Sequence, residues 1–285
     1  MKVLCAGVAL WLALAGTAAH AAARGIYTLA DGDVRVLRAI TWYRLAPGAR
    51  IEPGDVVDVA AHAAAQLELT PGGTLNVQGP ALLHAAALPQ PADKPALPAE
   101  FTLLRGWCKV AATPGTRPLA LQLPAVSVQV ANGVVVVHGN EGLAEIYVES
   151  GGARIAASVV RGKSSPREAR EGEYWRRAGD RALETEDRPT AEFVAAMPRD
   201  LRDALPALAA HFPGPPPELP AGREVTFVEA APWLTGPTRR VFARRFASRL
   251  RDPAFRAEAA AAHTIPEWDR TLHPERYRPP ASAAD

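Results

Sequence analysis

Closely spaced turns divide residues 45–83 into short apolar stretches, and this pattern constrains the fold more than any other feature of the chain. Pro47-Gly48 and Pro53-Gly54 are turn dipeptides, in which proline presets φ and glycine supplies a positive φ. Across residues 63–69 apolar and polar side chains alternate, as they do in a strand with one buried face. Turns at this spacing favour a sandwich, a barrel or a coiled sheet.

Strand patterns begin at Ile26 and continue to about residue 160. Asn132-Gly133 separates two valine-rich stretches, and Asn-Gly in that setting predicts a tight hairpin turn. Gly151-Gly152 predicts a further turn between strands. We therefore expect an all-β domain over residues 24–160.

The turn and core positions of this region resemble the FecR domain, an all-β periplasmic module best known from bacterial transmembrane regulators of iron-uptake sigma factors. The resemblance covers roughly residues 26–150. Val59 departs from it, because the family often has Thr or Ser there. The positions that carry it are Val34, Arg35, Val36, Leu45, Gly48, Ile51, Gly54, Asp55, Val57, Ala63, Ala65, Leu67, Leu69, Gly73, Leu75, Val77, Pro80 and Ala81. None of these positions is catalytic in the family, so the resemblance implies binding or signalling.

The N-terminus has the pattern of a cleavable export signal. Lys2 precedes an apolar stretch at residues 3–15, and Ala19-His20-Ala21 is a small-x-small cleavage site. We expect a signal peptide over residues 1–23, a periplasmic mature chain, and no membrane span after cleavage. The alternative is an uncleaved anchor, but the apolar core is shorter than the ~20 residues that a span needs. A sigma-factor regulator needs a cytoplasmic segment before its span, and only Met1 and Lys2 precede this one, so we do not expect direct anti-sigma activity.

Charge and helical spacing characterise the C-terminal part. Residues 161–188 are dense in charge and predict a solvated connector, with a possible last strand near residues 173–176. Helical spacing follows, so an all-α domain is expected over residues 189–277 and a tail over residues 278–285. The predicted fold class is α+β in two parts, the β domain first and the helical domain second.

Several helices are expected in that second part, the last two at residues 253–262 and 266–272. Thr190 can cap a helix that contains Phe193. The spacing of Leu201, Leu205 and Leu208 predicts a second helix, and a third runs from Pro237 to Arg251. Phe242, Phe246 and Leu250 form an apolar stripe on the third helix, and we expect it to pack against the leucines of the second.

No pattern in the sequence predicts catalysis, a metal or a cofactor. There is no Gly-x-Ser-x-Gly elbow and no phosphate loop, and the histidines lack the spacing of a metal site. Cys108 lies in an apolar stretch and reads as a small buried side chain. The net charge of +2 gives no general case for nucleic acid binding.

Two groups of side chains are candidates for contacts with a partner. The arginines of the third helix suit either a docked helix with charged heads in water or a surface for an anionic partner; they are Arg240, Arg244, Arg245, Arg249 and Arg251. Aromatic side chains of the β region can lie in the core or serve as exposed contacts; the candidates are Trp42, Tyr43, Tyr174 and Trp175.

The sequence therefore favours a non-catalytic module that binds a protein or another envelope ligand, with an envelope protein as the expected partner. One alternative is a module that binds peptidoglycan or another glycan through exposed aromatics. The other is an enzyme in the helical part, around Glu267, Trp268, Asp269 and His273.

Overall fold

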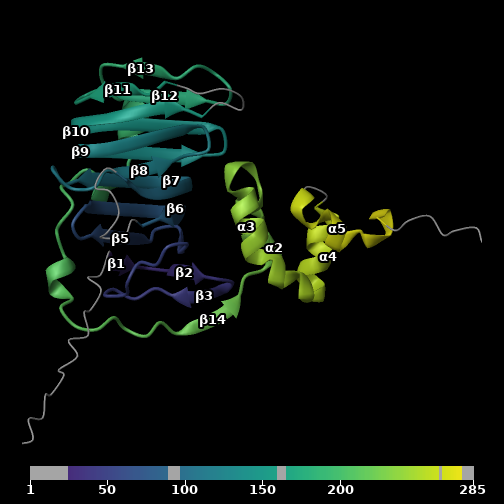
Figure 1. Ribbon diagram of the computed structural model, residues 1–285. Coiled ribbons are helices and arrows are strands. Elements are labelled where there is room, and N and C mark those ends of the chain that lie inside the picture. Colours follow the sequence, from purple (N-terminus) through teal and green to yellow (C-terminus); the bar gives the residue numbers. More distant parts are fainter. Residues whose placement is uncertain (1–24, 89–96, 159–164, 263–264, 278–285) are drawn as a thin grey trace, which may run out of the picture.

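The computed structural model describes residues 25–88, 97–158, 165–262 and 265–277. The expected signal peptide and the expected tail lie outside these residues. Fourteen strands of the described chain form one sheet, and short helices lie in the C-terminal part of the chain (Figure 1). A β-dominated α+β fold is thus confirmed.

The strands pair in the order β13-β12-β10-β9-β8-β7-β6-β4-β2-β3-β14, with β1 on β5, β5 on β6 and β11 on β10. Every pairing is antiparallel except that of β7 with β8. The strands are β1 (Ile26–Asp31), β2 (Val34–Arg38), β3 (Thr41–Arg44), β4 (Val56–Val59), β5 (Ala64–Leu69), β6 (Gly73–Ala87), β7 (Ala99–Ala112), β8 (Leu119–Gln122), β9 (Val126–Asn140), β10 (Leu143–Ala157), β11 (Arg167–Arg170), β12 (Tyr174–Ala178), β13 (Glu184–Glu186) and β14 (Ala221–Glu224).

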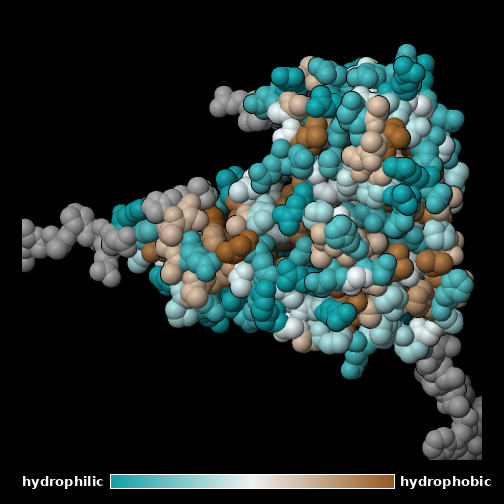
Figure 2. Space-filling view, turned by 180° about the vertical axis from the view of Figure 1, so that it is seen from behind, coloured by the Kyte–Doolittle hydropathy of each residue, from teal (hydrophilic) through white to brown (hydrophobic). Residues whose placement is uncertain are grey.

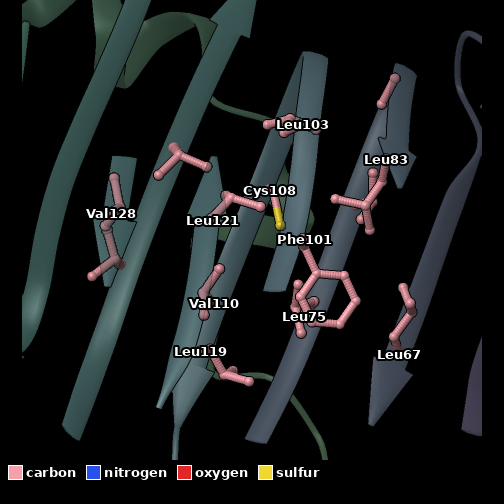
Figure 3. Packing of buried hydrophobic residues seen from close by; sticks show 14 of the residues in the cluster. Leu67, Leu75, Leu83, Phe101, Leu103, Cys108, Val110, Leu119, Leu121 and Val128 are labelled. Carbon is pink, nitrogen blue, oxygen red and sulfur yellow. The ribbon is translucent and has the colours of Figure 1, made fainter. Parts of the chain in front are cut away.

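The sheet encloses one apolar core built from alternate residues of its strands. Leu75 and Leu83 of β6 face Phe101 and Leu103 of β7 in this cluster (Figure 3). Cys108 lies among them with no exposed surface, and burial raises the pKa of its thiol far above the ordinary value. The predicted role of Cys108 as a small core side chain is confirmed.

Asn132-Gly133 and Gly151-Gly152 lie inside strands β9 and β10, so the predicted turns there are wrong. Gly133 in β9 faces Gly151 in β10, and the register of the pair shifts around them. A Cβ on Gly133 would lie 2.2 Å from the carbonyl oxygen of Ser150. The two long strands approach so closely that only glycine fits, and the chain reverses at Glu141-Gly142 instead.

Residues 161–188 differ from the solvated connector that the charge density predicts, because they contain β11, β12 and β13. The expected short strand near residues 173–176 is present as β12, whose Tyr174 and Trp175 are buried. Most other charged residues of these strands are exposed, so the charge density of the segment did not indicate strands.

The helical elements after β13 are short. The α-helices are α1 (Ala191–Ala196), α2 (Phe227–Ala230), α3 (Arg239–Phe246), α4 (Pro253–Ala261) and α5 (Asp269–Leu272). The 3-10 turns are η1 (Arg199–Leu201), η2 (Ala209–His211), η3 (Ala231–Leu234), η4 (Gly236–Thr238), η5 (Ala247–Arg251), η6 (Pro266–Trp268) and η7 (Pro274–Tyr277). Thr190 caps α1 as expected, by accepting a hydrogen bond from the Phe193 amide. The second predicted helix is wrong, since only η1 is helical near Leu201 and the chain then runs irregularly to η2.

The C-terminal chain covers two separate outer patches of the sheet. Phe193, Met197 and Leu201 pack on Trp107, Val136 and Tyr174. The α2–α5 region packs on the patch formed by Leu37, Trp42, Val56 and Leu82. No helix of the described residues is long and apolar enough to cross a membrane.

Candidate functional site

The helix that carries the candidate arginines is fixed to the sheet by its apolar stripe. Phe242 and Phe246 are fully buried, and Leu250 is 7% exposed, as expected. The expected partner is wrong, because Leu201 lies in the other cluster while Leu205 and Leu208 are only half-buried. A docked stripe of this kind fixes the direction in which the rest of the helix faces.

Arg245 fastens this helix to the strands beneath it. Its guanidinium donates hydrogen bonds to the carbonyl oxygens of Leu37 (2.8 Å), Ala39 (2.5 Å) and Gly54 (2.5 Å). Burial lowers the pKa of Arg245 to about 10, so the side chain stays charged at neutral pH. Its five N–H groups are largely used within the fold, which leaves little for a partner.

Arg249 has the same kind of role at the end of the helix. It donates to the carbonyl oxygen of Val225 at 3.0 Å and forms ion pairs with Glu224 and Asp252. Asp252 also caps α4 through the amides of Ala254 and Phe255. Arg249 thus joins β14, η5 and α4, and its charge is neutralised.

The other three candidates are exposed and face solvent. We call Arg240, Arg244 and Arg251 the arginine ridge. Within the described part of the chain, none of them has a hydrogen-bond or ion-pair partner. Val241, beside Arg240, is 59% exposed. The ridge therefore combines uncompensated positive charge with an apolar side chain on a rigid helix.

Hydrophobic and hydrophilic side chains are mixed over both the sheet and the C-terminal helical region in the view from behind (Figure 2). Val228 in α2 is 72% exposed and adds to the apolar surface of this region.

The candidate aromatic contacts are mostly in the interior. Trp42, Tyr174 and Trp175 are at most 5% exposed, and Tyr43 is half-buried. Trp42 donates to Glu229 at 3.2 Å beneath the guanidinium of Arg35, and Tyr174 donates to Glu145 at 2.6 Å. Of the two possibilities for these side chains, the three buried ones lie in the interior, because each completes a cluster under the C-terminal chain or in the core.

The residues of the alternative enzyme site do come close together. A cavity of about 380 Å³ is lined by Asp269, His273, Arg276 and Tyr277, among others. Asp269 accepts hydrogen bonds from Tyr277 and Arg276, and these contacts lower the pKa of its carboxyl. Glu267 pairs with Arg239 at 3.2 Å, and Trp268 is buried. The polar groups of this cluster bind one another, and the described residues contain no group of side chains that could hold a metal ion.

One set of buried polar side chains was not singled out by the sequence. Lys109 in β7 is 1% exposed, and Glu68 in β5 is 6% exposed. The alternation of residues 63–69 correctly places Gln66 and Glu68 on the face opposite the core. Nothing in the sequence indicates that a later segment covers that face.

No protein-family model and no curated protein matches this sequence. Two crystal structures named "putative anti-sigma factor from Parabacteroides distasonis ATCC 8503" are similar to it. The first has 12% sequence identity and a TM-score of 0.40, and the match covers 49% of this chain and 62% of that chain. The second has 11% identity and a TM-score of 0.39, and the match covers 49% of this chain and 63% of that chain. The chain thus spans less than two thirds of either structure, and neither assigns it a partner or an activity.

Proposed function

We propose that this chain is a non-catalytic FecR-like module of the periplasm that binds an acidic surface of a cell-envelope protein through the arginine ridge. The observation that carries the proposal is the contrast among five arginines of one helical segment. Arg245 and Arg249 fix the segment in place, while Arg240, Arg244 and Arg251 stay exposed and unpaired in the described structure.

The chemistry of the ridge suits carboxylates. A guanidinium presents planar N–H groups that can bind a carboxylate with two hydrogen bonds. Arg240 and Arg244 are four residues apart in α3, which places them on one side of the helix. The exposed side chain of Val241 offers apolar contact next to them. Charged groups at such a surface chiefly speed association and select the partner.

The periplasmic location rests on the N-terminal pattern of Lys2, the apolar stretch and Ala19-His20-Ala21. N-terminal sequencing of the exported protein is expected to begin near Ala22 or Arg24. A chain that still begins at Met1 would contradict this part of the proposal.

A charge-reversal experiment tests the binding surface. The immobilised mature chain is incubated with envelope extract, and the captured proteins are compared among wild type, R240E/R244E/R251E and R181E/R188E/R199E. The control arginines are also exposed and make no side-chain contact in the described structure, so both variants change the net charge equally. We expect the ridge variant to lose a band that the control retains, and higher salt to weaken that band.

Equal capture by both variants would contradict the role of the ridge. If no protein is captured and all three proteins sediment with purified peptidoglycan, a glycan-binding module would be favoured instead.

A further inference from the structure

A row of buried polar side chains crosses the outer face of β5, β6 and β7. Its members are Gln66, Glu68, Asn76, Gln78 and Lys109, and we call them the polar row. The strand register places Gln66 opposite Asn76, and Asn76 opposite Lys109. All five are between 1% and 7% exposed. A sheet face that stays covered is normally apolar, like the patch under α3, so this burial needs an explanation.

Gln66, Glu68 and Lys109 are covered by the irregular segment of residues 202–220, which we call the strap. It lies between Leu201, buried in an apolar cluster, and β14, which pairs with β3. In Figure 1 the chain between α1 and β14 runs along the side of the sheet. The strap is therefore held at both ends by contacts other than the polar row.

The polar row contacts the main chain of the cover. The Lys109 ammonium donates to the carbonyl oxygens of Leu201 (3.0 Å) and Asp203 (2.8 Å). Gln66 donates to the carbonyl oxygen of Pro206 at 2.8 Å. The Glu68 carboxylate accepts from the amides of Leu208 (2.7 Å) and Ala209 (3.0 Å).

The side chains of the strap contribute little to this contact. None of residues 202–220 is buried, and only Leu205, Leu208, Ala209, Phe212 and Leu219 are half-buried. Recognition through carbonyl and amide groups, which every residue but proline offers in full, accepts many sequences. The face thus has the properties of a site for a peptide that is bound through its main chain.

The polar row also keeps hydrogen bonds that do not involve the strap. Lys109 pairs with Glu149 at 2.7 Å, and Gln66 donates to Glu68 at 3.0 Å. Gln78 donates to Asn76 at 2.9 Å. If the strap leaves, water replaces its main-chain groups, and the apolar packing that is lost is that of half-buried side chains such as Leu219. Release of the strap therefore costs far less than release of α3, which would expose Phe242 and Phe246.

We propose that the polar row is a binding site for a peptide segment of a partner, bound through its main chain, and that the strap occupies this site in cis as a competitor. This site is separate from the arginine ridge and goes beyond the proposed function.

Proline substitution in the strap provides the test. L208P/A209P removes the two N–H groups that bind Glu68. A207P is the matched control, because Ala207 is exposed and its amide makes no hydrogen bond in the described structure. The probe is a labelled synthetic peptide with the sequence of residues 200–211, and binding is followed by fluorescence anisotropy. We expect the peptide to bind L208P/A209P at least about tenfold more tightly than wild type or A207P.

Substitution of the sheet residues checks where the peptide binds. Addition of E68Q and K109M to L208P/A209P should weaken peptide binding by about tenfold or more. The proposal is overturned if L208P/A209P binds the peptide no better than wild type, or if E68Q and K109M leave its binding unchanged.

Hydrogen exchange of the wild-type chain gives an independent test if the proline variant does not fold. We expect the amides of Leu208 and Ala209 to exchange much faster than those of β6 and β7, through local opening. Exchange of all these amides at one common rate, set by global unfolding, would show that the strap does not open and would overturn the proposal.

Discussion

Adjacent arginines on one helix, Arg244 and Arg245, have opposite roles in this protein. The spacing of the sequence predicts that charged heads flank a buried stripe, and the stripe is buried as predicted. Which arginine turns towards the sheet depends on the position of free carbonyl groups at Leu37, Ala39 and Gly54. Those carbonyls belong to distant strands, so helical spacing alone cannot separate Arg245 from Arg244.

Substitution of these two neighbours distinguishes the roles. R245M leaves three carbonyl groups without their charged donor, and we expect it to lower the free energy of unfolding by about 2–4 kcal/mol. R244M should change it by less than about 0.5 kcal/mol, because Arg244 is exposed and unpaired in the described structure. Urea denaturation measures both. Equal effects of the two substitutions would contradict the structural role of Arg245 in holding the helix to the sheet.

His84 makes the stability of the α3 contact depend on pH. It is 6% exposed, packs against Trp233 and Phe242, and its Nδ1 has no hydrogen-bond partner among the residues that the structure describes. Burial, followed by the charge of Arg245, lowers the pKa of His84 from 6.5 to about 4. The unfolded chain therefore binds a proton at pH values where the folded chain does not. Stability due to this group is complete above pH 6.5, falls as the pH drops from 6.5 to about 4, and then levels off.

The comparison of wild type with H84L isolates this effect. We expect wild type to lose about 3 kcal/mol more than H84L in the free energy of unfolding between pH 7 and pH 4, at about 1.4 kcal/mol per pKa unit. Carboxyl groups with lowered pKa values, such as Glu229, titrate in both proteins and cancel in the difference. A parallel pH dependence of the two proteins would argue against a buried, neutral His84.

At the scale of elements, strand existence was predictable and turn positions were less so. Alternating apolar residues identify the long strands, because one face of each lies in the shared core. Asn132-Gly133 leads to a wrong turn prediction, because glycine occurs where two strands approach closely as well as in turns. Residues 201–208 lead to a different error, because the spacing of their leucines predicts a helix that the structure does not contain. Their main-chain groups bind Lys109, Gln66 and Glu68 instead, and these tertiary contacts replace helical hydrogen bonds.

Two glycines with positive φ separate strand contact from turn geometry. Gly133 has φ 127°, and a Cβ there would meet the Ser150 carbonyl. Gly142 has φ 81°, and a Cβ there would lie in open space. We expect G142A to cost about 1 kcal/mol from backbone strain alone. G133A should cost clearly more, about 3 kcal/mol or above, because β9 and β10 must also move apart. Thermal denaturation measures both, and a cost for G133A no larger than that for G142A would contradict the close approach of these strands.

At the scale of the whole molecule, the sequence predicts two parts joined by a connector, and the structure shows how closely they share surfaces. Leu37, Trp42, Val56 and Leu82 of the sheet lie in one cluster with the α2–α5 region. Such sharing across distant segments cannot be predicted from local patterns, because it depends on which patch of the sheet remains uncovered. It also determines whether the helical region unfolds by itself.

Phe246 tests this coupling, since it is fully buried in the shared cluster, and Val241 on the same helix is its exposed control. F246A should lower the free energy of unfolding by about 3–5 kcal/mol, as core Phe truncations do, while V241A should have little effect. Because the cluster joins the sheet and the helical region, we expect peptides from β4 and from α4 to lose hydrogen-exchange protection at the same urea concentration in wild type. In F246A both should shift together to lower urea. If α4 alone loses protection early while β4 is unchanged, the helical region is a separate domain, as its sequence suggests, and the shared cluster contributes little to the stability of the sheet.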